Sequence, residues 1–102
     1  MVRVELSLDA QRDVLEIAAH ITTESGSRQR GEDFLEGVFA TCETLASHPA
    51  MGELRTEFKT ALDRSFSAGR DVIYFQPTAA GIVVARILHG SRDHSSISPK
   101  AS

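Results

Sequence analysis

A chain of 102 residues, 41% hydrophobic and 25% charged, fits one globular domain, and its apolar runs fall far short of the ~20 residues of a membrane span. Acidic residues near the start, where a signal peptide would be apolar, and the single Cys42 predict a cytoplasmic protein with no membrane partner, disulfide framework, metal site or cofactor. The net charge of −3 divides into −5 for residues 1–51 (four basic against nine acidic residues) and +2 for residues 52–102 (seven basic against five acidic residues). This distribution argues against nonspecific nucleic-acid binding, which needs a concentrated positive charge. It leaves room for a small basic patch that meets an acidic partner.

The first half of the chain predicts a short strand followed by a helical hairpin. Residues 2–6, VRVEL, alternate apolar and polar side chains, which is typical of a strand. Apolar residues then recur at helical spacing, which predicts one helix over about 8–23 and a second over about 28–47. The two apolar stripes are Leu8, Val14, Ile17, Ala18 and Ile21, then Phe34, Leu35, Val38, Cys42 and Leu45. Gly26 suits the end of the first helix, and the short linker predicts an antiparallel hairpin that ends at Pro49.

The second half predicts a loop and three strands. Residues 49–55, PAMGELR, are typical of a loop. From about 61, ALDRSFS alternates, and RDVIYFQP and IVVARILH are rich in β-branched and aromatic residues. The turn signals AG (68–69) and TAAG separate these segments, so they should form an antiparallel meander. With the first strand at the sheet edge and the helices over one face, the order β-α-α-β-β-β is a two-layer α+β domain, expected over residues 1–97 with a flexible tail at 98–102.

Three arginines in or beside neighbouring predicted strands are the first candidates for a functional surface. If Arg64, Arg70 and Arg86 emerge on one face, they form a small basic cluster. Otherwise each is solvated or paired with a nearby carboxylate, such as that of Asp63, Asp71 or Asp93. Arg86 interrupts the apolar run IVVARIL, so it must reach water, a carboxylate or a partner, because burying it unpaired is costly.

Residues 89–94, HGSRDH, hold residue types that are found in active sites. A serine triad would need Ser91 beside an oriented imidazole, but close neighbours on an extended chain point in different directions and no GxSxG pattern is present. A zinc site would lack a clear third ligand beside the two histidines. Ribonuclease chemistry would need a base, an acid and cations, which a histidine with Arg64, Arg86 and Arg92 could provide. The remaining alternative is a polar strand end that turns.

The apolar stripes of the helices should mainly form the core. A two-layer domain with a short helix pair can nevertheless leave an apolar groove at its margin, and such a groove suits a docking segment. The candidates for lining it are Phe58, Phe66 and Phe75.

The segments DVLEIAAHI, HPAMGELR, RSFSAGRDVIYFQP and GIVVARILHGSRD occur in this order over about residues 2–94. Together they resemble the ParE branch of the RelE/ParE toxin superfamily, and LHGSRD at the end of the last strand is the most specific piece. The resemblance implies a RelE/ParE-like fold and the toxin role in a type II toxin–antitoxin pair, with plasmid stabilization as its setting. It also implies that DNA gyrase is poisoned by binding, without catalysis, and that a ParD-like antitoxin neutralises the toxin and alone contacts operator DNA.

The RelE-like branch, which cleaves mRNA on the ribosome, is strongly basic and commonly carries a catalytic tyrosine near the C-terminus. This chain has a net charge of −3, only Lys59 and Lys100 as lysines, and only Tyr74, in a middle strand. Gyrase poisoning is therefore favoured, with a RelE-type endonuclease or a non-toxic degenerate member as alternatives, and no residue is assigned a catalytic role. The residues expected to bind the target or the antitoxin are Arg64, Arg70, Arg86, His89 and Arg92.

Overall fold

The computed structural model describes residues 2–54 and 64–90. Strand β1 (Arg3–Leu6) leads into two helices, α1 (Leu8–Ser25) and α2 (Arg28–Ser47). The elements that follow are a 3-10 turn η1 (Pro49–Met51) and the strands β2 (Glu53–Leu54), β3 (Arg64–Ala68), β4 (Asp71–Pro77) and β5 (Gly81–His89). The flexible tail predicted at 98–102 lies outside the described residues. Within the described part, neither helix is apolar enough over its length to cross a membrane.

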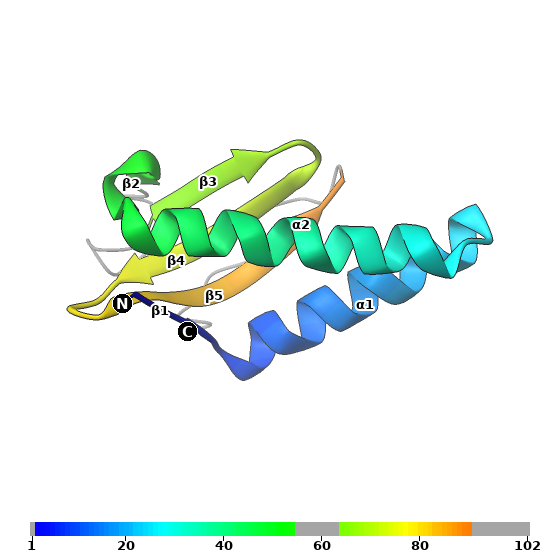
Figure 1. Ribbon diagram of the computed structural model, residues 1–102, viewed down its shortest axis with the longest axis horizontal. Coiled ribbons are helices and arrows are strands. Elements are labelled where there is room, and N and C mark those ends of the chain that lie inside the picture. Colours follow the sequence, from blue (N-terminus) through cyan, green and yellow to red (C-terminus); the bar gives the residue numbers. More distant parts are fainter. Residues whose placement is uncertain (1, 55–63, 91–102) are drawn as a thin grey trace.

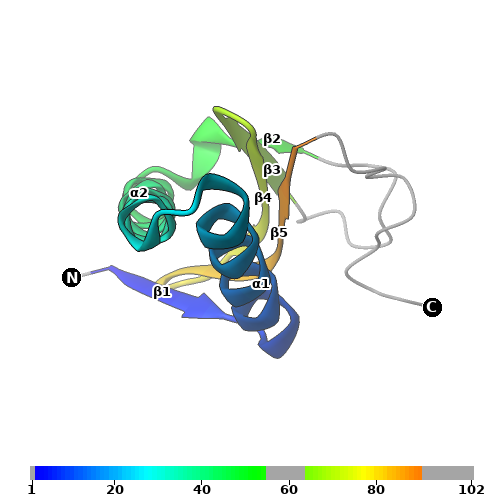
Figure 2. The ribbon, with the colours of Figure 1, turned by 90° about the vertical axis from the view of Figure 1, so that its right-hand side faces the viewer.

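The strands form one sheet in the order β1-β5-β4-β3-β2. Strand β1 pairs in parallel with β5, and the other neighbours pair antiparallel. Both helices cover the same face of this sheet, with α1 over the β5 side (Figure 1). Seen from the end, the helices form one layer and the strands the other (Figure 2). The predicted two-layer α+β class, with its helical hairpin and its antiparallel meander, is confirmed.

The start of α1 is attached to the sheet by its capping residue. The Ser7 hydroxyl accepts a hydrogen bond from the Ala10 backbone N–H at 3.0 Å and donates one to the Ala85 carbonyl of β5 at 2.8 Å. A capping serine satisfies a backbone donor that has no partner within the helix. At the other end, Gly26 has φ 69°, the left-handed conformation that favours glycine and that ends the helix as the sequence predicts.

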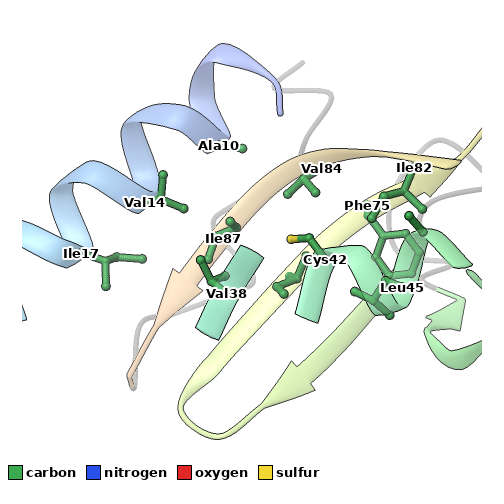
Figure 3. Close-up of a cluster of buried hydrophobic side chains, with 12 residues drawn as sticks. Ala10, Val14, Ile17, Val38, Cys42, Leu45, Phe75, Ile82, Val84 and Ile87 are labelled. Atoms are coloured by element: carbon green, nitrogen blue, oxygen red, sulfur yellow. The ribbon is translucent and has the colours of Figure 1, made fainter. Parts of the chain in front are cut away.

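The core fills the space between the helices and the sheet (Figure 3). It contains residues from α1, α2, β4 and β5: Ala10, Val14, Ile17, Val38, Cys42, Leu45, Ala46, Ile73, Phe75, Ile82, Val84 and Ile87. Leu8, predicted on the core stripe of α1, is 70% exposed, and this part of the prediction is wrong. The stripe starts instead at Ala10, because Ala10, Val14, Ile17 and the half-buried Ile21 follow the helical repeat without a break.

The segment predicted as a loop over 49–55 contains a strand. Residues Glu53 and Leu54 pair with Ser65 and Arg64 of β3, which makes the sheet five-stranded. A strand of two residues is too short to show alternation in a sequence. Its position is supported by Gly52, because the Arg64 guanidinium donates to the Gly52 carbonyl at 3.0 Å.

Candidate functional site

A bulge in β5 decides where Arg86 lies. Tyr74 of β4 pairs with Arg86, but the next residue, Phe75, pairs with Val84, so Ala85 is an extra residue in β5. As a result, Val84 and Ile87 both enter the core although they are three residues apart, and Arg86 is left at the margin of the sheet. There it meets a carboxylate from α1.

That carboxylate belongs to Asp13, whose side chain is 7% exposed. Arg86 donates from Nε to Asp13 Oδ2 at 2.7 Å and from Nη2 to Oδ1 at 2.9 Å, which is the two-bond geometry that strengthens arginine–carboxylate pairs. The Ile87 backbone N–H donates to Oδ2 at 2.9 Å. The hydrogen bond that Arg86 donates to Asp13 raises the pKa of Arg86 above its ordinary value, against the opposing effect of partial burial. Arg86 therefore joins α1 to β5. The sequence left open whether this side chain reaches water, a carboxylate or a partner, and in the structure it pairs with a carboxylate.

Arg64 begins β3 and Arg70 lies two residues beyond its end, six positions further along the chain, a separation of up to about 20 Å in extended conformation. Arg64 donates to the Gly52 carbonyl beside β2. Arg70 lies in the turn between β3 and β4, where its carbonyl accepts the Gly90 N–H at 2.8 Å. The three arginines are therefore in three different places, so of the two alternatives that the sequence left open, a single basic cluster is not formed.

Arg70 does meet His89, in a cleft of about 800 Å³ between α1 and the end of β5. We call it the α1–β5 cleft; the residues that line it are Glu16, Ile17, His20, Ile21, Glu24, Ser25, Arg30, Arg70, His89 and Gly90. Helix α1 contributes two carboxylates and the apolar side chains of Ile17 and Ile21. The cations come from the first turn of α2 and from the turn after β3. No ion pair joins Arg30 or Arg70 to another described residue.

His89 is held in one orientation from two sides. Its Nδ1 lies 2.6 Å from Asp71 Oδ1, and its ring meets the ring of Phe34 edge-on, with centroids 6.0 Å apart and an interplanar angle of 76°. When the Asp71 carboxylate accepts a hydrogen bond from Nδ1–H, the second ring nitrogen, Nε2, remains for a ligand. Asp71 and His89 are opposite each other in the β4–β5 register. Counting back from the hairpin turn without the extra residue Ala85 would pair Asp71 with Leu88, so the sequence alone does not find this pair.

The predicted apolar groove is not formed by the predicted residues. Phe75 is 0% exposed and lies in the core under α2, so its assignment to a groove is wrong; it sits on the helix-covered face of a central strand. Phe66 is half-buried against the same core, and Phe58 lies outside the described residues, as does Arg92. In residues 2–54 and 64–90, no group of three or more potential metal ligands comes together.

Most residues that line or orient the α1–β5 cleft were not predicted as site residues, and three of these matter most for its charge and for the orientation of His89. They are Arg30, Phe34 and Asp71. Arg30 and Phe34 lie on α2, far in sequence from His89, and nothing in the local pattern of either helix indicates that they reach the end of β5.

Comparison with known proteins gives a family and a fold. A family model described as the ParE toxin of the type II toxin–antitoxin system parDE matches residues 4–94. No curated protein sequence matches the chain. Among solved structures, one titled "Chromosomal ParDE TA system from P. aeruginosa" has a similar fold, with a TM-score of 0.71 and 15% sequence identity. The similarity covers 89% of this chain and 98% of that chain.

Proposed function

The chain belongs to the ParE toxin family of type II toxin–antitoxin systems, and from this premise we propose that it inhibits DNA gyrase by binding and that a ParD-like antitoxin neutralises it. The observation that carries the proposal is the α1–β5 cleft, in which Arg30, Arg70 and His89 converge from three separate parts of the chain over an apolar floor. Such a lining suits a peptide segment with both acidic and apolar side chains, which is the chemistry of a protein partner.

The charges of the cleft suit an antitoxin tail in particular. Arginine side chains pair with carboxylates through two parallel hydrogen bonds, and such pairs select a partner more by charge pattern than by buried area. The carboxylates of Glu16 and Glu24 on α1 would meet basic residues of the same tail and set its direction. Arg86, by contrast, contributes to the site only by holding α1 against β5, since its guanidinium is bonded to Asp13.

A supercoiling assay tests the proposed target. Purified protein at micromolar concentration should inhibit supercoiling by gyrase or trap cleaved DNA, and adding the antitoxin should restore normal supercoiling. No effect on gyrase under these conditions would reject the target. Normal growth during induced expression without antitoxin would point instead to a non-toxic member of the family.

A binding experiment tests the cleft. The Arg70→Glu variant should bind the antitoxin at least 10-fold more weakly than the wild type, because it places a carboxylate where the cleft has a cation. The matched control is Arg12→Glu, the same charge reversal at an exposed residue of α1 that does not line the cleft. Equal weakening by both variants would mean that only the net charge of the toxin matters.

One observation favours a second candidate function, that of an mRNA endonuclease. Asp71 orients His89 in a cleft that also holds two arginines, and an oriented imidazole beside cations is part of what RNA cleavage needs. The test is ribosome-dependent mRNA cleavage by the wild type and by His89→Gln. Cleavage that is lost in the variant would replace gyrase poisoning as the proposed activity.

A further inference from the structure

A second cavity, of about 230 Å³, lies between α2 and the β3–β4 hairpin. Its apolar lining includes Phe34, Val38 and Ile73, and Gly37 forms part of its helical wall. We call it the Gly37 pocket. It corresponds in kind to the apolar groove predicted at the margin of the domain, but its phenylalanine comes from α2.

Contacts among the described residues do not require glycine at position 37. It lies within α2, where glycine destabilises a helix relative to alanine. A Cβ built at Gly37 meets no atom within 4 Å in residues 2–54 and 64–90, whereas at Gly31, in the same helix, a Cβ would lie 2.3 Å from Thr22 Oγ1. Gly31 is therefore explained by the close contact between the two helices. No contact with another described residue explains Gly37, which is one of the residues that line the pocket.

We propose that the Gly37 pocket receives one large apolar side chain of the antitoxin, and that a lysine or arginine next to that side chain pairs with Asp33 and Asp71 at the rim. The inference rests on the proposed toxin–antitoxin function and names the chemistry of the segment that binds. A cavity of about 150 Å³ accommodates benzene, so 230 Å³ accommodates one aromatic or branched side chain and not a helix. Glycine in the wall lets the partner's backbone approach α2 closely.

The rim of the pocket is acidic and therefore favours a positively charged group on the partner. Two carboxylates, those of Asp33 and Asp71, line it, and none of its lining residues is basic. Each carboxylate uses Oδ1 within the chain: that of Asp33 accepts from Gln29 Nε2 at 2.8 Å, and that of Asp71 faces His89 at 2.6 Å. A cation arriving with the apolar side chain would therefore find two acceptors that are already oriented.

The pocket and the α1–β5 cleft meet at one group of side chains. Phe34 and Asp71 line the pocket, His89 lines the cleft, and both Phe34 and Asp71 contact His89. One continuous partner segment that crosses this group can fill both sites, with acidic residues at the cleft and a basic residue at the pocket. A second copy of this chain, or the target, is a different occupant, and the test below distinguishes them.

The experiment compares Gly37→Ala and Gly37→Leu with the wild type, using as the probe the ParD-like antitoxin that the proposed function requires. Both variants should fold, because the space at Gly37 is open, and Gly37→Ala should melt about 4 °C higher because alanine favours the helix. Antitoxin binding should weaken about 10-fold for alanine and at least 100-fold for leucine, which fills the pocket. The matched control is Ala40→Leu, an exposed position of α2 that lines neither site, and its affinity should stay within 2-fold of the wild type.

Each outcome supports the inference or overturns it. A more stable toxin that binds antitoxin more weakly supports it, and a further loss in Asp33→Lys supports the charge at the rim. Unchanged antitoxin affinity in Gly37→Leu overturns it, and so does a loss of gyrase inhibition alone, which would make the target the occupant. Conversion of a wild-type dimer to a monomer by Gly37→Leu would make a second copy the occupant. If the wild type does not bind the antitoxin at all, the proposed function itself fails, and the inference with it.

Discussion

Replacing Asp13 by alanine should remove the connection between α1 and β5. The Ile87 N–H loses its acceptor, and a buried donor without a partner costs about 1–3 kcal/mol. Arg86 loses both of its bonds to the carboxylate. Breaking a fully buried pair costs about 3–5 kcal/mol, but the Arg86 side chain is 23% exposed and can turn towards water, so this range is an upper limit. We expect Asp13→Ala to lower the free energy of unfolding by roughly 2–4 kcal/mol.

Urea unfolding followed by circular dichroism measures this loss. Arg86→Met should cost at least as much, because the Asp13 charge that it leaves behind is the more buried of the two, at 7% exposed. The double variant should cost less than the sum of the single variants by roughly 1–3 kcal/mol. Glu5→Gln is the control: its pair with Arg3 spans 3.5 Å between exposed side chains and should contribute less than about 1 kcal/mol. Single effects that simply add, or a loss below about 0.5 kcal/mol for Asp13→Ala, would refute the reasoning.

Three further predictions concern buried positions. Burial raises the pKa of the Cys42 thiol to about 11, so the unfolded chain releases this proton at lower pH than the folded chain. The free energy of unfolding should therefore fall between pH 9 and 11 by about 1.4 kcal/mol per pH unit. Urea unfolding measured over this pH range should show the dependence in the wild type and not in Cys42→Ala. Gly31→Ala should lower the free energy of unfolding by about 1–3 kcal/mol, since its methyl group would collide with Thr22; unchanged stability would contradict the close helix contact. Gly81→Ala should displace β1, because its Cβ would overlap the Arg3 backbone, and amide hydrogen exchange should show lost protection in β1 with α2 unaffected.

The sequence predicted those parts of the fold that depend on neighbours along the chain. The apolar repeats of α1 and α2, the stop at Gly26 and the turns around β4 are all local patterns, and each corresponds to an element of the structure. The toxin family was also predicted from short segments and is confirmed by the match over residues 4–94. Strand β2 was missed because two residues carry no periodicity.

The candidate site could be predicted only in part. His89 and Arg70 were predicted and do share a cleft, since they flank one β-hairpin and its register brings them together. Arg86 was predicted beside them, but a single extra residue in β5 turns it towards α1, and no pattern in the sequence indicates that bulge. Whether any of these residues binds the antitoxin or gyrase remains a prediction for the binding experiments.

By itself, the sequence determined the order and type of the elements, because helical and strand periodicity arise from residues at most a few positions apart. Only the tertiary structure decided which charges are engaged and which are open to a partner. Asp13 and Arg86 are 73 positions apart and still form the most buried ion pair in the described part of the chain. Gly37 lies in a helix that looks unremarkable in the sequence, and it becomes informative only when the hairpin opposite it leaves its Cβ position empty. Which charged side chains are paired, and where a pocket forms, depends on which segments far apart in sequence come into contact. The packing of the helices on the sheet determines those contacts.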